Sequence, residues 1–286
     1  MLKIPDHQVA GHQACDGLLG PLVDDSGRFY KPLQSDHRGS NEMTFYTSFS
    51  SNENIPTHIR NFFPHFYGTQ NLQSSDGSGL RPHLVLENLV SSYTNPSIMD
   101  VKIGARTWPP DSSEDYIAKC FNKDRITTSV SLGFRVSGFH IYNYNKLEFW
   151  KPDKKWVQSF SHDDVRLVLR KFVSSNACED PDSRPDSAFA SEVYGGSKGI
   201  LAQLLELKEW LQDQSMYHFY SCSVIMIYSK ELGGAVIKLV DFAHVVEGKG
   251  VIDHNFLGGI CSLIKFISDV LISSPEEEEQ QCPPIS

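Results

Sequence analysis

The run from Pro96 to Gly104 (Pro-Ser-Ile-Met-Asp-Val-Lys-Ile-Gly) constrains the fold of this chain more than any other segment. Pro96 fixes its own backbone φ and favours extended geometry at the residue before it. If the run continues extended, alternate side chains share a face, so Asp100 and Lys102 project together. The inward-facing side chains of the run are apolar: Met99, Val101 and Ile103. A carboxylate beside an ammonium suits phosphoryl transfer, but an exposed strand with a weak salt bridge has the same pattern.

The charge balance limits which ligands the protein can recruit. The 286 residues carry a net charge of −9, and four of those negative charges belong to the run 276–279, so residues 1–272 carry −9 + 4 = −5. A surface of that sign repels polyphosphates at long range. We therefore expect no direct nucleic-acid binding, and a phosphorylated ligand needs a local cationic pocket. The hydrophobic share of 40% and the charged share of 21% are typical of a globular protein.

Targeting signals and cysteine spacing indicate a compartment. The N-terminus lacks the apolar core of a signal peptide, and we expect no transmembrane segment. Six cysteines are scattered without a C-x-x-C pair, which argues against a zinc ribbon or a disulfide scaffold. We predict a monomer in the nucleus and cytoplasm.

Hydrophobic periodicity and turn residues predict an α+β protein whose first lobe is rich in sheet. Strands are expected at 28–31, 82–90, 131–142, 224–228 and 236–240. Helices are expected at 42–49, 55–63, 200–211 and 257–271, with another beginning after Ser112. Residues 73–79 read as a hairpin tip, 176–198 as a long loop and 273–286 as an acidic disordered tail.

Two further segments could carry chemistry. An apolar strand delivers Asp241 followed by Phe242, an order that places a magnesium ligand in kinases, although Asp is also a common helix N-cap. Lys31 ends a short predicted strand, and Glu42 follows on a predicted helix. This order is similar to the lysine–glutamate pair that positions ATP phosphates, but surface lysines are common.

The helix predicted after Ser112 begins with residues typical of a capping box, Ser112 to Asp115. Ile117, Cys120 and Phe121 fall on one face of it, and a second face carries Tyr116, Lys119 and Lys123. The two lysines form a like-charge pair four residues apart, which destabilises a helix by about 0.2–0.5 kcal/mol. A bound polyanion would turn this repulsion into a favourable interaction, so the two lysines could bind a phosphorylated ligand. The alternative is that they form a solvated basic face without a ligand.

In their order along residues 25–272, these motifs resemble the inositol phosphate kinase family, and within it the plant multikinases. The hallmark P-x-x-x-D-x-K-x-G is met from Pro96 to Gly104 without a mismatch. The remaining matches are Val240-Asp241-Phe242 with Ala243-His244, Leu132 to Val136, and Tyr30 to Gln34 with Arg38, Gly39 and Glu42.

The resemblance implies a two-lobed kinase-like fold related to protein kinases and ATP-grasp enzymes, with a sheet-rich N-lobe and a larger mixed C-lobe. The N-lobe would span residues 1–90 and the C-lobe 91–272, with 105–130 as the inositol phosphate-binding segment. There is no G-x-G-x-x-G loop and no H-R-D-L-x-x-x-N, which disfavours protein kinase activity.

The resemblance also implies a role for individual residues. Lys31 would hold the ATP phosphates, and the backbone of Glu87 and Leu89 would meet the adenine. Asp100 would lie near the ribose and the reacting hydroxyl, and Asp241 would bind Mg²⁺. The inositol polyphosphate pocket would be lined by Gln34, Arg38, Lys102, Lys119, Lys123 and His244.

The activity implied is the ATP-dependent phosphorylation of Ins(1,4,5)P3 at the 6- and 3-hydroxyls, through an InsP4, to Ins(1,3,4,5,6)P5. Only 27 residues separate Gly104 from Leu132, and a short, open wall should accept several phosphorylation states of inositol. Two alternatives come from relatives: a non-catalytic partner of transcription regulators, and a lipid phosphoinositide kinase. The presence of Lys31, Lys102 and Asp241 favours catalysis over the first.

Overall fold

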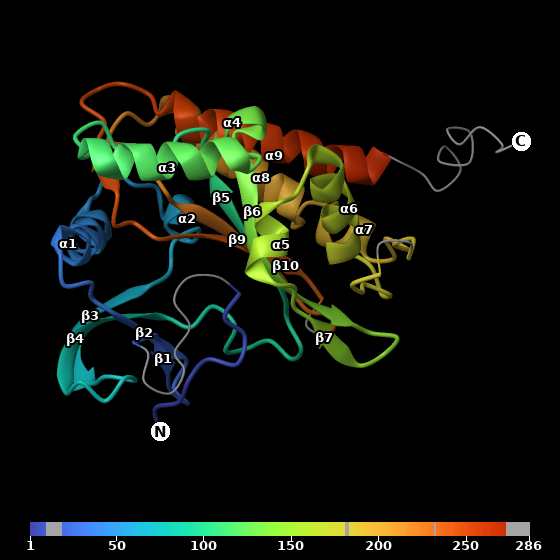
Figure 1. Ribbon diagram of the computed structural model, residues 1–286, viewed down its shortest axis with the longest axis horizontal. Coiled ribbons are helices and arrows are strands. Elements are labelled where there is room, and N and C mark those ends of the chain that lie inside the picture. Colours follow the sequence, from blue (N-terminus) through green and yellow to red (C-terminus); the bar gives the residue numbers. More distant parts are fainter. Residues whose placement is uncertain (10–18, 181–182, 232, 273–286) are drawn as a thin grey trace, which may run out of the picture.

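The computed structural model describes residues 1–9, 19–180, 183–231 and 233–272. The first lobe holds an antiparallel sheet in the order β1-β2-β4-β3, at the lower left of Figure 1. Its strands are β1 (Leu22–Val23), β2 (Arg28–Pro32), β3 (Phe66–Gln73) and β4 (Leu80–Glu87). Ser74 N donates to Gly79 O at 3.0 Å between the last two strands, which confirms the hairpin tip.

The second lobe is built on a five-stranded sheet in the order β10-β9-β5-β6-β7. These strands are β5 (Ser97–Ile103), β6 (Phe134–Asn143), β7 (Glu148–Trp150), β9 (Ser223–Tyr228) and β10 (Ala235–Val240), and β8 (Tyr217–Phe219) pairs separately with β11 (Val245–Glu247). The central strand β5 is the run that begins after Pro96. Its side chains Met99, Val101 and Ile103 are fully buried, as predicted.

Helices cover both lobes, and together with the two sheets they give the predicted α+β architecture (Figure 1). They are α1 (His37–Ser51), α2 (Thr57–Arg60), α3 (Glu114–Ile126), α4 (Ser129–Leu132), α5 (Lys154–Gln158), α6 (His162–Phe172), α7 (Ala190–Val193), α8 (Ile200–Asp213) and α9 (His254–Ile272). In Figure 1, α3 and α9 lie along the top of the molecule, above the end of the second sheet, and α1 lies beside the first lobe. The boundary at residue 90 stays a prediction, and the tail 273–286 lies outside the described residues.

An aromatic cluster joins α1 to the second lobe. The Phe45 ring lies 4.3 Å from the Phe242 ring, and Phe63 lies 4.1 Å from Phe49 and 5.3 Å from Phe242, measured between centroids. Phe242 is fully buried. Aromatic side chains bury large apolar areas, so this cluster fixes α1 against the loop that follows β10.

The start of α1 requires a glycine. Asp36 caps the helix by accepting from Arg38 N, and the turn that follows brings Gly39 against Gln34. A Cβ at position 39 would overlap the carbonyl oxygen of Gln34. The close approach of these two backbone segments therefore fixes the direction in which α1 leaves β2.

The outer edge of β10 is covered by polar groups from two other elements. The Gln203 carboxamide, on α8, accepts from Ile237 N at 3.0 Å and donates to Ala235 O at 2.7 Å. Leu239 N donates to Phe62 O at 2.6 Å. These contacts satisfy backbone groups that an edge strand would otherwise leave unpaired.

Helix α9, which includes the helix predicted at 257–271, is long and apolar. It is 19 residues long and contains a window of mean hydropathy 1.6, so by length and composition it could span a membrane. In this fold it is a core helix whose buried side chains line one face: Phe256, Gly259, Ile260, Leu263, Phe266, Ile267 and Val270.

Several predicted element boundaries were wrong. The helix expected at 55–63 is confined to Thr57–Arg60, because Pro56 starts it and Pro64 prevents its extension. The strand expected from Ser131 begins at Phe134, after the short helix α4 and a left-handed Gly133 with φ 74°. The long loop 176–198 contains the short helix α7.

Two helices differ from the prediction in detail. Helix α3 begins at Glu114 with Ser113 as its N-cap, which accepts from Tyr116 N, so the cap lies one residue later than Ser112. In α8, Leu207 is buried while Leu205 is 46% exposed. The apolar spacing in 200–211 predicts a face made of Ile200, Leu201, Leu204, Leu205, Lys208 and Leu211, so the buried face of α8 is rotated from it towards Leu207.

Candidate functional site

A buried ion cluster joins the two lobes. Lys31 Nζ, on β2, lies 2.8 Å from Glu42 Oε1 on α1 and 2.8 Å from Asp241 Oδ1, the residue that follows β10. Glu42 is 3% exposed, whereas the Asp241 side chain is 45% exposed. Folding thus brings together the predicted lysine–glutamate pair and Asp241, which the sequence suggested separately.

The backbone after β10 explains how Asp241 is aimed at the cluster. Asp241 adopts φ 70°, which is uncommon for a residue other than glycine. Phe242 N then donates to Glu42 Oε1 at 3.1 Å. The same glutamate oxygen therefore accepts from the lysine and from the loop, and it fixes both to α1. The N-cap alternative for Asp241 is not met, because a strand and not a helix follows at Val245.

The contacts in this cluster keep Lys31 protonated and Asp241 ionised. Burial alone would lower the pKa of Lys31, but the carboxylates of Asp241 and Glu42 outweigh it and raise that pKa above its ordinary value. Partial burial opposes ionisation of Asp241, yet the ammonium groups of Lys31 and Lys102 lower its pKa to about 2. Asp241 is thus an anion at every physiological pH.

Asp100 lies on β5 in a different environment. It is 5% exposed, and its Oδ1 is buried without a hydrogen-bond partner among the described residues. Burial raises the pKa of Asp100 to about 6, the nearby Asp241 adds to the increase, and Lys102 opposes it. A buried carboxylate oxygen without a partner is ready to accept a hydrogen bond from a ligand hydroxyl.

Lys102 lies two residues along the same strand and does not pair with Asp100. Its Nζ donates to Ser221 O at 2.6 Å. Ser221 has φ 56°, so a residue held in the left-handed region presents its carbonyl to the amine. No sequence motif points to this partner, because Ser221 is distant from Lys102 along the chain.

Three elements meet beside Lys102. Tyr116 OH, on α3, lies 2.9 Å from His244 Nε2. Burial lowers the pKa of His244 to about 4, and the positive charges of Arg38 and Lys102 lower it further. These side chains, Arg38, Lys102, Tyr116 and His244, come from α1, β5, α3 and the loop after β10, and we call them the electropositive rim because two of them are cations.

Arg38 and Gln34 occupy the N-lobe side of this rim. The Arg38 guanidinium pairs with Asp36 at 2.7 Å, and both side chains are partly exposed. Gln34 Oε1 is buried without a partner among the described residues. Both side chains retain hydrogen-bonding capacity.

Lys119 and Lys123 are exposed on α3, one turn apart. Desolvation of its ammonium by neighbouring protein atoms lowers the pKa of Lys123 to about 8, and the cations Arg135, Lys154 and Lys102 contribute. Lys123 therefore belongs to the electrostatic environment of Lys102. The structure shows no comparable relation for Lys119, which stays a prediction.

The predicted adenine-binding segment follows β4. The Glu87 carboxylate pairs with Lys238 Nζ of β10 at 3.1 Å and accepts from His65 N at 3.2 Å. Leu89 packs with apolar side chains of the second sheet, among them Ile98 and Ile225. The segment is thus tied to both lobes, and an apolar surface lies next to it.

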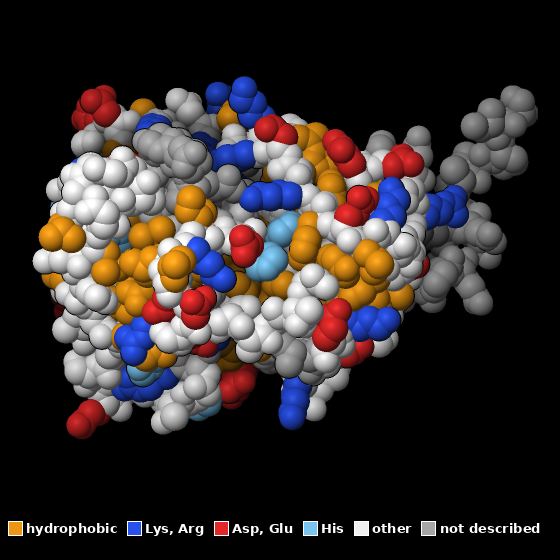
Figure 2. Space-filling model, turned by 90° about the horizontal axis from the view of Figure 1, so that it is seen from below, with side chains coloured by type: hydrophobic (Ala, Val, Ile, Leu, Met, Phe, Trp, Pro, Cys, Tyr) orange, Lys and Arg blue, Asp and Glu red, His pale blue; other side chains and the backbone are white. Residues whose placement is uncertain are grey.

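The site fits a divalent cation bound together with phosphates. Mg²⁺ needs only one or two carboxylates besides phosphate oxygens, and Asp241 offers an ionised, half-exposed carboxylate. The described residues hold no group of three or more His, Cys, Asp or Glu side chains arranged for a metal. On the face shown in Figure 2, positive and negative side chains are interspersed, so this face carries no large basic surface.

Comparison with known proteins decides the family. A sequence model described as inositol polyphosphate kinase matches residues 83–268. The chain belongs to the inositol polyphosphate kinase family. It is therefore a kinase, and both the resemblance and the enzyme class predicted from the sequence are confirmed.

Relatives of this kinase cover nearly its whole length. It is 60% identical to inositol polyphosphate multikinase beta of Arabidopsis thaliana, over 98% of this chain and 97% of that protein. It is 47% identical to inositol polyphosphate multikinase IPK2 of Oryza sativa subsp. japonica, over 96% and 97% respectively.

Solved structures confirm the two-lobed kinase-like fold. One, from structural studies and protein engineering of inositol phosphate multikinase, has a TM-score of 0.71 and 54% identity, and covers 80% of this chain and 99% of that one. Another, inositol phosphate multikinase Ipk2 from S. cerevisiae in complex with ADP and Mn²⁺, has a TM-score of 0.67 and 20% identity, and covers 85% and 99%.

Sequence reasoning missed a polar group beneath the rim, which consists of the buried side chains of Thr107, Asp124 and Arg135 and the partly exposed Ser221. Arg135 lies within an apolar strand, and a charged side chain there needs a partner. That signal could have pointed to Arg135, but nothing in the spacing identified Asp124 as the partner.

Proposed function

We propose that this kinase transfers the γ-phosphoryl group of ATP to Ins(1,4,5)P3 at the 6- and 3-hydroxyls, through an InsP4, to Ins(1,3,4,5,6)P5. The observation that carries the proposal is the position of Lys31 Nζ, 2.8 Å from both Glu42 and Asp241, beside the electropositive rim around Lys102. The relatives named multikinases and the short segment between Gly104 and Leu132 support several phosphorylation steps.

Each residue has a role in this proposal. Lys31 binds the ATP phosphates, and Asp241 holds Mg²⁺, which neutralises charge on the transferred group. The yeast structure with ADP and Mn²⁺ supports use of a nucleotide and a divalent metal. Asp100 orients the attacking hydroxyl, and Lys102 contacts the inositol phosphate. Catalysis then consists of positioning and charge stabilisation without a covalent intermediate.

The substrate pocket is the rim itself. Arg38 and Lys102 both lower the pKa of His244, and Lys102 contributes to the lowered pKa of Lys123, which supports a common pocket for these side chains. Gln34 and Lys119 complete the proposed set. The backbone of Glu87 and Leu89 binds the adenine. Association with transcription regulators, a monomeric state and a location in nucleus and cytoplasm stay predictions.

The direct test is incubation of the purified protein with ATP, Mg²⁺ and Ins(1,4,5)P3, followed by anion-exchange separation of the products. We expect InsP4 first and then Ins(1,3,4,5,6)P5. Phosphatidylinositol bisphosphate in vesicles serves as a parallel substrate. Phosphorylation of the lipid without phosphorylation of Ins(1,4,5)P3 would contradict the proposal in favour of the lipid kinase alternative.

A further inference from the structure

Helix α3 is attached to the molecule in an unusual way. Its single buried side chain is the carboxylate of Asp124, which is completely buried, whereas Phe121 and Ile126 are 48% and 68% exposed. Surface helices normally bury an apolar stripe, and that stripe determines how they lie. The position of α3 therefore depends on polar contacts to a greater degree than is usual.

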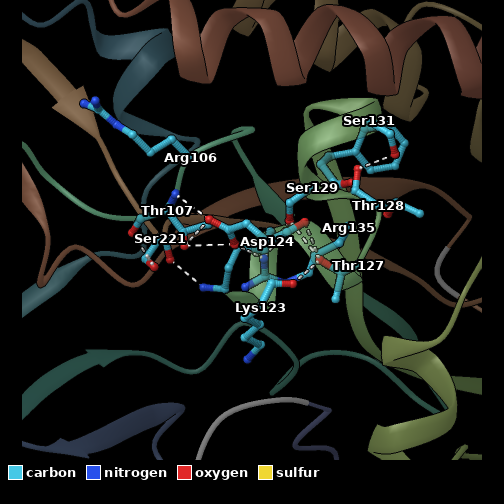
Figure 3. Close-up of polar contacts among 12 residues, drawn as sticks. Arg106, Thr107, Lys123, Asp124, Thr127, Thr128, Ser129, Ser131, Arg135 and Ser221 are labelled. Carbon is cyan, nitrogen blue, oxygen red and sulfur yellow. Dashed lines mark hydrogen bonds and ion pairs between the residues drawn. The ribbon is translucent and has the colours of Figure 1, made fainter. Parts of the chain in front are cut away.

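Asp124 is the centre of those contacts (Figure 3). It accepts from Thr107 N at 3.0 Å, from Thr107 Oγ1 at 2.8 Å and from Arg135 Nη1 at 2.7 Å. Arg135 also donates to Ser129 Oγ at 2.6 Å and is itself 5% exposed. Charge-assisted hydrogen bonds of this kind are short and directional, so they fix orientation as well as contact.

The same network continues to Lys102. Ser221 Oγ donates to Thr107 O at 3.0 Å, and Ser221 O accepts from Lys102 Nζ at 2.6 Å. Arg135 lies directly opposite Lys102 in the pairing of β5 with β6. Residues from α3, β5, β6 and the segment before β9 thus form one continuous polar chain, and the proposed substrate lysine is at its end.

We propose that Asp124 is a positioning residue for inositol polyphosphate binding. Through Thr107 and Ser221 it fixes α3, and with it Lys119 and Lys123, relative to Lys102. A polyphosphate needs several cations at set separations, and a displacement of about 1 Å can reduce activity about 100-fold. This inference rests on the proposed function and adds to it the residue that sets the geometry of the pocket.

The nucleotide side of the site is held by other contacts, although Lys102 lies close enough to Asp241 to help lower its pKa. Lys31, Glu42 and Asp241 are held by β2, α1 and the loop after β10, without a contact to Asp124. Loss of the Asp124 network should therefore affect the inositol phosphate and leave the nucleotide unaffected. A residue that only stabilises the fold would instead reduce the active fraction and leave both KM values unchanged.

The experiment compares Asp124→Asn with the wild type and with Asp163→Asn, an exposed carboxylate on α6 paired with Arg166. We expect Asp124→Asn to raise the KM for Ins(1,4,5)P3 about tenfold or more and to leave the KM for ATP within about twofold. Asp163→Asn should change neither. A loss of kcat alone, or an equal rise in both KM values, overturns the proposal.

A second pair of variants decides the outcome if Asp124→Asn does not fold. Thr107→Val removes the hydroxyl that donates to Asp124, whereas Thr107→Ser retains it. We expect a raised KM for Ins(1,4,5)P3 in the valine variant and near-wild-type values in the serine variant. Equal KM values in the two variants overturn the proposal.

If the wild type neither binds nor phosphorylates Ins(1,4,5)P3, the proposed function fails and this inference fails with it. If the wild type is active, only this inference is at stake.

Discussion

Lys31 Nζ and Asp241 Oδ1 lie 2.8 Å apart although 210 positions separate the residues in the chain. One belongs to the first lobe and the other follows the last strand of the second lobe's sheet. Their contact joins the two lobes at the proposed phosphate end of the site, and each residue helps to keep the other charged.

Asp241→Asn should abolish metal-dependent turnover while the protein remains folded. Asparagine tolerates the left-handed φ of 70° at this position better than most residues, so the backbone should not change. We expect kcat to fall about 100-fold or more, since charge stabilisation of the transferred group is lost. The measurement is turnover at saturating Mg²⁺, with Tm as the control for folding; activity close to that of wild type would contradict the assignment.

Lys102→Met should remove turnover with little effect on folding. The methionine keeps the length of the side chain but cannot neutralise an inositol phosphate, and Ser221 O loses its donor. Lys265→Met is the matched control, because Lys265 is an exposed lysine in a surface pair with Asp269. Steady-state kinetics on both variants should show the loss only at position 102, and equal activity in the two would refute the role of Lys102.

Asp100→Asn should stabilise the protein at neutral pH while it inactivates it. Burial raises the pKa of Asp100 from 3.8 to about 6, so its stabilising contribution is fully present below pH 3.8 and is lost as the pH rises through about 6. Above that window the charged carboxylate lowers the free energy of unfolding by about 1–3 kcal/mol relative to a neutral side chain.

Thermal unfolding at several pH values tests this effect. The variant should have the higher Tm at pH 7, and its advantage should disappear towards pH 4. A Tm difference that does not depend on pH would show that burial of the charge is not its cause.

Lys238→Met should weaken nucleotide binding selectively. Lys238 Nζ holds the Glu87 carboxylate at 3.1 Å, and Glu87 belongs to the segment proposed to meet the adenine. Without this tie we expect the KM for ATP to rise a few-fold while the KM for Ins(1,4,5)P3 does not change. Glu87→Gln should have the same effect because it weakens the same contact, and opposite effects from the two variants would contradict this role.

Much of the architecture could be predicted because it follows from local patterns. The alternation along β5 predicts the burial of Met99, Val101 and Ile103, although Asp100 on the other face is buried as well, and the apolar run before Asp241 predicts β10. The prediction of a helix at 55–63 was too long, because Pro56 and Pro64 confine the helix to a single turn. Hydrophobic periodicity alone does not account for this effect of proline. Helix α9 was predicted, but only its packing against the second sheet distinguishes it from a membrane span.

The charged residues of the site could be predicted from the sequence, but the residues that hold them in place could not. Lys31, Glu42 and Asp241 belong to motifs with a recognisable order, and the structure brings them together. The partners of Lys102 and α3 could not be found this way. Ser221 contributes a backbone carbonyl, which any residue type has, and Asp124 looks like an ordinary helix carboxylate until Arg135 and Thr107 surround it.

The amide of Gln203 has a consequence for behaviour at high protein concentration. It occupies backbone groups of β10 that another molecule would need in order to extend the sheet. The carbonyl oxygen of Phe62 accepts from the next free backbone amide, Leu239 N. At the opposite margin β7 is only three residues long. Intermolecular sheet growth is thus obstructed on both sides, and replacing Gln203 with leucine should make the protein form oligomers when it is concentrated.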